Sequence, residues 1–127
     1  MKHFFTLSIL AIFLSSFIRF AGIDDVIAAL RTGNAASVAK FFDNSVGISM
    51  PDKSNTYSKS QAEMVLKDFF ASNPVKSFEI IHKGENAGSQ YCIGTLQTKS
   101  GAYRTTIFMK LQKDNTQVLQ ELRFENR

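Results

Sequence analysis

Cysteine and histidine are scarce in this sequence, and their scarcity limits the sites it can build. Cys92 is the one cysteine, so no disulfide can form within the chain. The two histidines are His3 and His82, and His3 falls in an N-terminal segment that we expect to be removed. A metal site with more than one imidazole ligand is therefore excluded from the remaining domain, and packing must supply its stability.

Motifs that would identify a reaction are also missing. The sequence contains no Ser–His–Asp spacing, no phosphate-binding loop and no pair of acids placed for catalysis. Among the carboxylates expected near the helices, Asp43 ends a helix, Asp52 lies in a turn, and Asp68 lies on the polar side of a helix. Cys92 is expected to be a small buried hydrophobic residue rather than a nucleophile. We therefore expect no catalysis, no cofactor and no bound metal.

Residues 1–21 have the pattern of a signal peptide. A short basic start precedes residues 4–18, which are apolar apart from four hydroxyl residues. A membrane-spanning helix needs about 20 apolar residues, so this run is short for a span. We expect cleavage after Ala21 and export to the periplasm or the exterior, although Arg19 stands where cleavage sites usually have a small residue. An uncleaved leader that tethers the domain to a membrane is the alternative.

The exported part, residues 22–127, is close to neutral. The whole chain carries a formal net charge of +4, and Lys2 and Arg19 fall in the leader, so the exported part carries +2. Its basic residues are interspersed with acidic ones, unlike the basic patch of a nucleic-acid-binding protein. We therefore expect no nucleic-acid partner. No cysteine lies near the end of the leader, so we also expect no lipid anchor.

Two short helical patterns begin the expected domain. Ile23 is the first of four apolar residues spaced i, i+3, i+4 and i+7, which predict one face of a helix. Gly33 is a suitable end for that helix. Asn34 is expected to cap a second short helix, whose buried side extends to Phe42.

The rest of the domain is predicted to be mostly strand. A short strand at 46–50 and a polar loop at 52–57 precede a third helix, which begins at a capping box of Ser58 and Gln61. The four strands expected after it are 78–83, 91–98, 103–111 and 117–125. No repeat or linker interrupts the pattern. The sequence therefore predicts one α+β domain with three N-terminal helices packed on one face of a curved, mainly antiparallel sheet of about five strands.

The hairpin turns predict how the strands align. If residues 100–101 and 114–115 are two-residue turns, Cys92 faces Met109, and Met109 faces Gln120. Both hairpins then put the same side of the middle strand inward, as a consistent register requires. The strand carboxylates expected to point outward are Glu79, Glu121 and Glu125.

The order of elements resembles that of nuclear-transport-factor-2-like proteins, which have a cone-shaped, cystatin-like α+β fold. The stretches that carry the resemblance are DDVIAALRTGNAASVAKFFDNSVGISMP, YSKSQAEMVLKDFF and TTIFMKLQKDNTQVLQELRFE. More narrowly, the chain is similar to small exported members of that superfamily that are domains of unknown function. The resemblance implies a pocket enclosed by the sheet and the helices. Because the superfamily contains isomerase-like and cyclase-like enzymes as well as binding modules, the fold does not decide the function.

Inward-facing polar residues of the sheet are the candidates for ligand binding. The expected pocket residues are Gln120, Thr105, Tyr103, His82 and Met109. A buried amide without a partner costs about 1–3 kcal/mol, so Gln120 must bond to backbone, water or a ligand. One interpretation is an internal hydrogen-bond network. The other is that these side chains orient a small apolar ligand in the cavity.

The outward face of the sheet is expected to carry an apolar patch. Its members are Ile81, Ile93, Phe108 and Leu119. One interpretation is a stripe shielded by the long stems of neighbouring lysines and arginines. The other is a homodimer that packs sheet to sheet, as the resembled fold often does.

Two hypotheses of function follow. The first is an exported, non-catalytic module that binds a small or apolar ligand in the cone. The second is a structural or interaction module that assembles through its outer sheet face. An isomerase-like or cyclase-like enzyme ranks third, because the tyrosine–aspartate arrangement of such enzymes is not visible. A membrane partner is expected only if the leader is uncleaved.

Overall fold

Three helices and six strands make up residues 22–127, the part of the chain that the computed structural model describes. Their bounds are α2 (Ile23–Thr32), α3 (Ala35–Ala39), β1 (Phe42–Ser49), β2 (Ser54–Ser58), α4 (Lys59–Ser72), β3 (Val75–Asn86), β4 (Ser89–Thr98), β5 (Gly101–Leu111) and β6 (Gln117–Asn126). The expected signal peptide, residues 1–21, lies outside the described residues. None of the described helices is long and apolar enough to cross a membrane.

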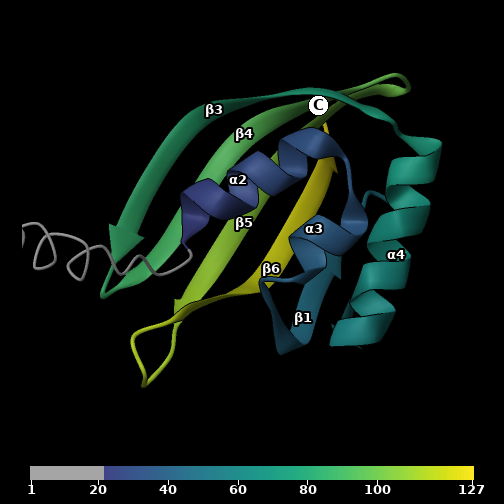
Figure 1. The fold of residues 1–127 in the computed structure, drawn as a ribbon. Helices are drawn as coiled ribbons and strands as arrows, with labels where there is room; N and C mark the ends of the chain where they lie inside the picture. The colour runs from purple at the N-terminus through teal and green to yellow at the C-terminus, as the bar shows by residue number, and fades with distance from the viewer. Residues whose placement is uncertain (1–21) are drawn as a thin grey trace, which may run out of the picture.

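The helices lie on one face of a single curved sheet (Figure 1). The strand order is β2-β1-β6-β5-β4-β3. β1 runs parallel to β6, and every other neighbouring pair is antiparallel. α2 contacts β3 and β4, whereas α4 contacts β1 and β2 at the other end of the sheet.

The prediction of three N-terminal helices followed by a sheet of about five strands was wrong. The fold is α+β, but the sheet has six strands and is mixed, and α4 follows β1 and β2 in the chain. The additional strand is β2, which forms where a polar loop at 52–57 was expected. β2 is an edge strand with polar, mostly exposed side chains, so no apolar alternation marks it in the sequence.

Capping residues set most of the helix ends. Gly33 adopts φ 68° and ends α2, a left-handed conformation that glycine adopts without strain. The expected capping box of Ser58 and Gln61 begins α4, and the Asn34 side chain caps α3. The second helix is shorter than predicted, because Phe42 is buried as the first residue of β1 rather than on a helix.

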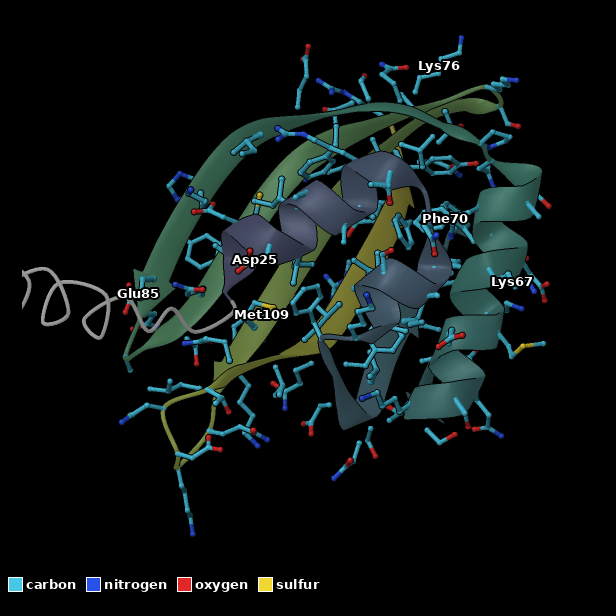
Figure 2. The ribbon with its side chains drawn as sticks, in the orientation of Figure 1. Asp25, Lys67, Phe70, Lys76, Glu85 and Met109 are labelled. Atoms are coloured by element: carbon cyan, nitrogen blue, oxygen red, sulfur yellow. The ribbon has the colours of Figure 1, made fainter. Side chains whose placement is uncertain are left out.

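The core between the helices and the sheet is filled by the domain's own side chains. The largest side chains with almost no exposed surface are Phe124, Leu30, Ile48, Leu66, Leu96, Ile107, Met109, Leu119 and Leu122. In Figure 2, Phe70 lies on the side of α4 that faces the rest of the domain, and Lys67 lies on the opposite side. Each fully buried large apolar side chain contributes about 1.5–3 kcal/mol to folding, so this packing accounts for stability without a disulfide.

The turn of the first hairpin lies one residue earlier than expected. Thr98 pairs with Gly101, so residues 99–100 make the turn, and Cys92 faces Ile107 instead of Met109. The Thr98 hydroxyl donates to the Gly101 carbonyl oxygen at 2.8 Å, which stabilises this turn. Because the register moves by two residues, the predicted inward side of β4 and β5 is unchanged.

A β-bulge in β6 separates the second hairpin from its predicted register. Ile107 pairs with Leu122 as expected, but Met109 pairs with Leu119, so Gln120 is the additional residue. A bulge leaves its additional residue out of the ladder and shifts the side chains beyond it to the other face. Leu119 therefore lies in the core with no exposed surface, and its predicted place on the outward face was wrong.

A second bulge changes the direction of the side chains in β3. Ile80 pairs with Gly94 and His82 pairs with Ile93, which leaves Ile81 without a partner. Ile93 alternates with buried Cys92 on β4. His82 therefore lies on the outward side of the sheet, and the prediction that it points inward was wrong.

Close packing at Gly94 gives a test of this core. A Cβ atom at Gly94 would lie 2.4 Å from Cζ of Phe78 and 2.5 Å from the carbonyl oxygen of Glu79. We expect Gly94→Ala to lower the free energy of unfolding by about 2 kcal/mol, because neither the ring nor the backbone can move away freely. Urea unfolding measures this change.

Gly47→Ala is the matched control. A Cβ at Gly47 would lie 3.7 Å from Cγ of Glu121, an ordinary contact. We expect its effect to stay within about 0.5 kcal/mol. Equal losses in the two variants would contradict the packing described here.

Candidate functional site

A pocket of about 420 Å³ opens at the end of the cone where α4 meets the sheet. Its walls come from the loop between β1 and β2, from α4 and its C-terminal cap, and from β5 and β6. The residues that line it are Met50, Pro51, Asp52, Lys53, Val65, Asp68, Phe69, Ser72, Asn73, Tyr103 and Asn126. A pocket of this volume is within the range of small-molecule sites.

A buried amide fixes the polar wall of the pocket. The Tyr103 hydroxyl donates to Oδ1 of Asn73 at 2.7 Å, and Nδ2 of Asn73 donates to the Phe69 carbonyl oxygen at 3.0 Å. Asn73 is 8% exposed, so its bond to Phe69 is buried and its bond to Tyr103 is partly buried. The hydroxyl of Tyr103 is therefore held in one place at the pocket wall.

Aromatic rings form the apolar wall. The Phe69 ring stacks on Phe124 with centroids 4.3 Å apart, and Tyr103 meets Phe69 edge-on at 5.2 Å. Aromatic pairs in such geometries contribute about 0.5–1.5 kcal/mol beyond the area they bury. The wall therefore belongs to the core and gives the pocket a rigid floor.

The charged groups of the pocket lie at its mouth. Asp52, Lys53 and Asp68 are all exposed. No group of three or more potential metal-binding side chains occurs among residues 22–127. Away from the pocket, burial raises the pKa of the Cys92 thiol, which keeps it protonated and unreactive at neutral pH.

The expected pocket residues do not meet in one cavity. Tyr103 lines the pocket. Thr105 is buried behind it and donates to the Tyr103 carbonyl oxygen at 3.3 Å, and Met109 is a core residue on β5 (Figure 2). Gln120 lines a separate polar depression with Gly47 on the outward face, because the bulge removes it from the inward register.

His82 also lies apart from the pocket. Its Nε2 atom is 2.8 Å from the Tyr91 hydroxyl, and both side chains lie on the outward side of β3 and β4. The pair therefore contributes to the outer surface of the sheet.

Several pocket residues were not predicted. The sequence predicts Asn73 as the end of a helix, Met50 as the end of a strand, and Asp52 and Lys53 as part of a polar loop. The Asn73-Pro74 step does predict that the helix ends at Asn73. An asparagine at a helix end often bonds to the nearby backbone, so its side chain is held in a fixed position. Nothing in the local sequence indicates that this cap lies beside Tyr103.

Phe108 is the exposed large apolar side chain that the strand pairing places on the outward face, where it is 36% exposed. Ile81 is 59% exposed, but as the unpaired residue of the β3 bulge it is not assigned to a face by the pairing. Ile93 is half-buried between the neighbouring strands, and Leu119 is absent from this surface. Glu121 and Arg123 form an ion pair of 2.8 Å on the same face.

Removing a tyrosine hydroxyl tests the polar wall. Tyr103→Phe leaves Oδ1 of Asn73 without its donor in a buried position. We expect a loss of about 1–2 kcal/mol in the free energy of unfolding. Tyr91→Phe is the matched control, because its bond to His82 is exposed and should be worth about 0.5 kcal/mol or less. Thermal or urea unfolding compares the two, and a larger loss in Tyr91→Phe would contradict the buried network.

Solved structures of known proteins share this fold. A Bacteroides uniformis protein of the DUF4783 family is 28% identical, with a TM-score of 0.79 over 84% of this chain and 98% of that one. A Bacteroides fragilis protein of the same family is 26% identical, with a TM-score of 0.77 over 84% and 99%. A nuclear-transport-factor-2-like protein of unknown function from Cytophaga hutchinsonii shares the fold alone, at 13% identity and a TM-score of 0.58 over 80% and 83%.

The family match covers nearly the whole described domain. No curated protein shows significant similarity to the chain. Residues 23–125 match the family described as "Domain of unknown function (DUF4783)". The resemblance to an uncharacterised nuclear-transport-factor-2-like domain is thereby confirmed. The chain belongs to the DUF4783 family, a domain of unknown function with the nuclear-transport-factor-2-like fold.

Proposed function

We propose that this domain is an exported, non-catalytic binding module that holds a small ligand between α4 and Tyr103. The observation that carries the proposal is the pocket of about 420 Å³ with one apolar aromatic wall and one polar wall. A ligand site of this kind combines apolar surface with a few polar groups in fixed positions. Tyr103 and Asn73 supply those groups, since their mutual bond is already formed.

The polar groups of the pocket favour binding over catalysis. The Tyr103 hydroxyl donates to a neutral amide, not to a carboxylate or an imidazole that could accept its proton. The carboxylates that line the pocket, Asp52 and Asp68, lie at its exposed mouth. The walls therefore orient a bound molecule but offer no buried general base.

Export of the module is supported by the sequence pattern of residues 1–21. A chain that begins at Gly22 would keep the whole described domain. The backbone nitrogen of Gly22 donates to Oδ2 of Asp25 at 2.9 Å at the start of α2, so the domain is capped from that residue onward.

Native mass spectrometry of the protein purified from its own host tests the binding function. We expect a co-purifying small molecule that is lost on denaturation. Tyr103→Phe should reduce its occupancy, because one fixed polar contact disappears, whereas Tyr91→Phe should leave it unchanged. A protein of apo mass from every growth condition, with no small molecule in the denatured extract, would count against binding.

A homodimer through the outer sheet face is the second candidate function. Phe108 is exposed and Ile93 is half-buried there, and the face carries both acidic and basic side chains, among them Arg104 and Glu125. A second copy could cover the apolar residues and place acid against base across a two-fold axis. Both observations favour self-association over an unrelated partner.

Analytical ultracentrifugation tests the homodimer. We expect a dimer at micromolar concentration that Phe108→Glu shifts to monomer, because a buried, unpaired charge at the interface is unfavourable. Met64→Glu is the control, since Met64 is 59% exposed on α4, away from the sheet's outer face. A wild-type monomer at high micromolar concentration would exclude this assembly.

A further inference from the structure

The pocket between α4 and Tyr103 has an excess of negative charge. Two carboxylates, Asp52 and Asp68, line it against one ammonium group, Lys53. Neither carboxylate forms an ion pair within residues 22–127. No ion-pair partner among the described residues therefore cancels their charge, which acts on whatever enters the pocket.

The orientation of α4 adds to this field. The helix has 14 residues and no basic residue in its last turn, so no charged side chain of the helix offsets the partial negative charge at its C-terminal end. The Phe69 and Ser72 carbonyl oxygens there accept hydrogen bonds from the neutral groups of Asn73 and Ser100. Phe69 and Ser72 of that last turn, and the capping residue Asn73, all line the pocket. The negative end of the helix thus lies at the same wall as Asp68.

The aromatic wall is suited to a cation as well. The half-buried ring of Tyr103 lines the pocket next to the apolar side chains of Met50 and Val65, and the buried Phe69 ring lies against Tyr103. A cation near an aromatic ring is attracted by the ring's negative face. An apolar wall in a negative field disfavours anions.

We propose that the ligand of this pocket is a small organic cation, an ammonium group carried on an apolar body. The proposal rests on the binding function proposed above and names its ligand class. The apolar body contacts Val65, Phe69 and the ring of Tyr103, and the ammonium group lies toward Asp68. An inorganic metal ion fits less well, because no cluster of three or more metal-binding side chains occurs in the described part of the chain.

Titration with matched probes tests the ligand class. Choline carries the ammonium group, 3,3-dimethylbutan-1-ol is its neutral carbon isostere, and 3,3-dimethylbutyrate is an anion of the same shape. Binding is followed by two-dimensional NMR of the full domain, with the backbone signals of Asn73 and Tyr103 as reporters. We expect choline to bind about tenfold more tightly than the alcohol, and the anion not to bind.

Two variants of α4 locate the charge effect. Asp68→Asn should weaken choline binding about fivefold and leave binding of the alcohol unchanged, because only the ammonium group interacts with the lost charge. Glu63→Gln removes one negative charge from the same helix, but Glu63 lies at a different depression and should change neither affinity. Both sites are on the helix surface, so the fold is retained, as thermal unfolding will verify.

The outcomes separate the ligand class from the binding function. If the alcohol or the anion binds as tightly as choline, or if Glu63→Gln has the effect of Asp68→Asn, the cation proposal is overturned and the binding function stands. If no probe shifts the reporter signals at high millimolar concentration, the cation proposal fails. If the native protein also carries no small molecule, the binding function fails with it.

Discussion

The stack of Phe69 on Phe124 joins α4 to the end of the sheet, and the pocket depends on it. The two rings lie 4.3 Å apart with planes 21° from parallel, and both side chains are buried. Asn73 caps α4 four residues after Phe69, so the two residues lie on the same side of the helix end. Fixing the Phe69 ring therefore also fixes the amide that accepts the Tyr103 hydroxyl. The contact between the two rings therefore belongs both to the core at this end of the sheet and to the floor of the pocket.

The sequence predicted the strands after Pro74 well but not the two β-bulges. The pairing of Ile107 with Leu122 follows from counting back from the turn, and the structure confirms it. Near the turn, two alternations fit the apolar residues. One turns Val118 and Leu122 inward with Gln120 between them, and the other turns Leu119 inward. Periodicity alone cannot choose between these alternations, because a bulge changes the phase by one residue. The helices of the core select the one that buries Leu119.

The same limit explains which part of the site could be predicted. Tyr103 was predicted as a pocket residue because its strand has a clear inward side. Asn73, Asp68 and the loop at 50–53 meet it only because β1 runs parallel to β6. Two parallel strands that pair in a sheet can come from distant parts of the chain, as β1 and β6 do, so no local sequence pattern predicts their pairing. β2 was missed for a related reason, since an exposed polar edge strand needs no apolar residues.

The filled core also sets how tightly such a pocket can bind. Thr105 and Met109 have no exposed surface, so a ligand cannot pass deeper into the cone without displacing the core. Any molecule that binds in the pocket must then be small and partly exposed to water. A molecule of about ten non-hydrogen atoms, at roughly 0.3–0.6 kcal/mol per atom, gains on the order of 3–6 kcal/mol, which corresponds to millimolar to tens-of-micromolar affinity.

Weak binding of this kind is useful for an abundant ligand, or for one that presents several copies of the same group. The pocket lies on the helix side of the sheet, and the exposed Phe108 lies on the opposite side, so a dimer formed through the outer face would leave both pockets open. Two open pockets on one particle bind a multivalent ligand far more tightly than either does alone. Ligand binding and sheet-to-sheet assembly are therefore compatible on this fold, and each would strengthen the effect of the other.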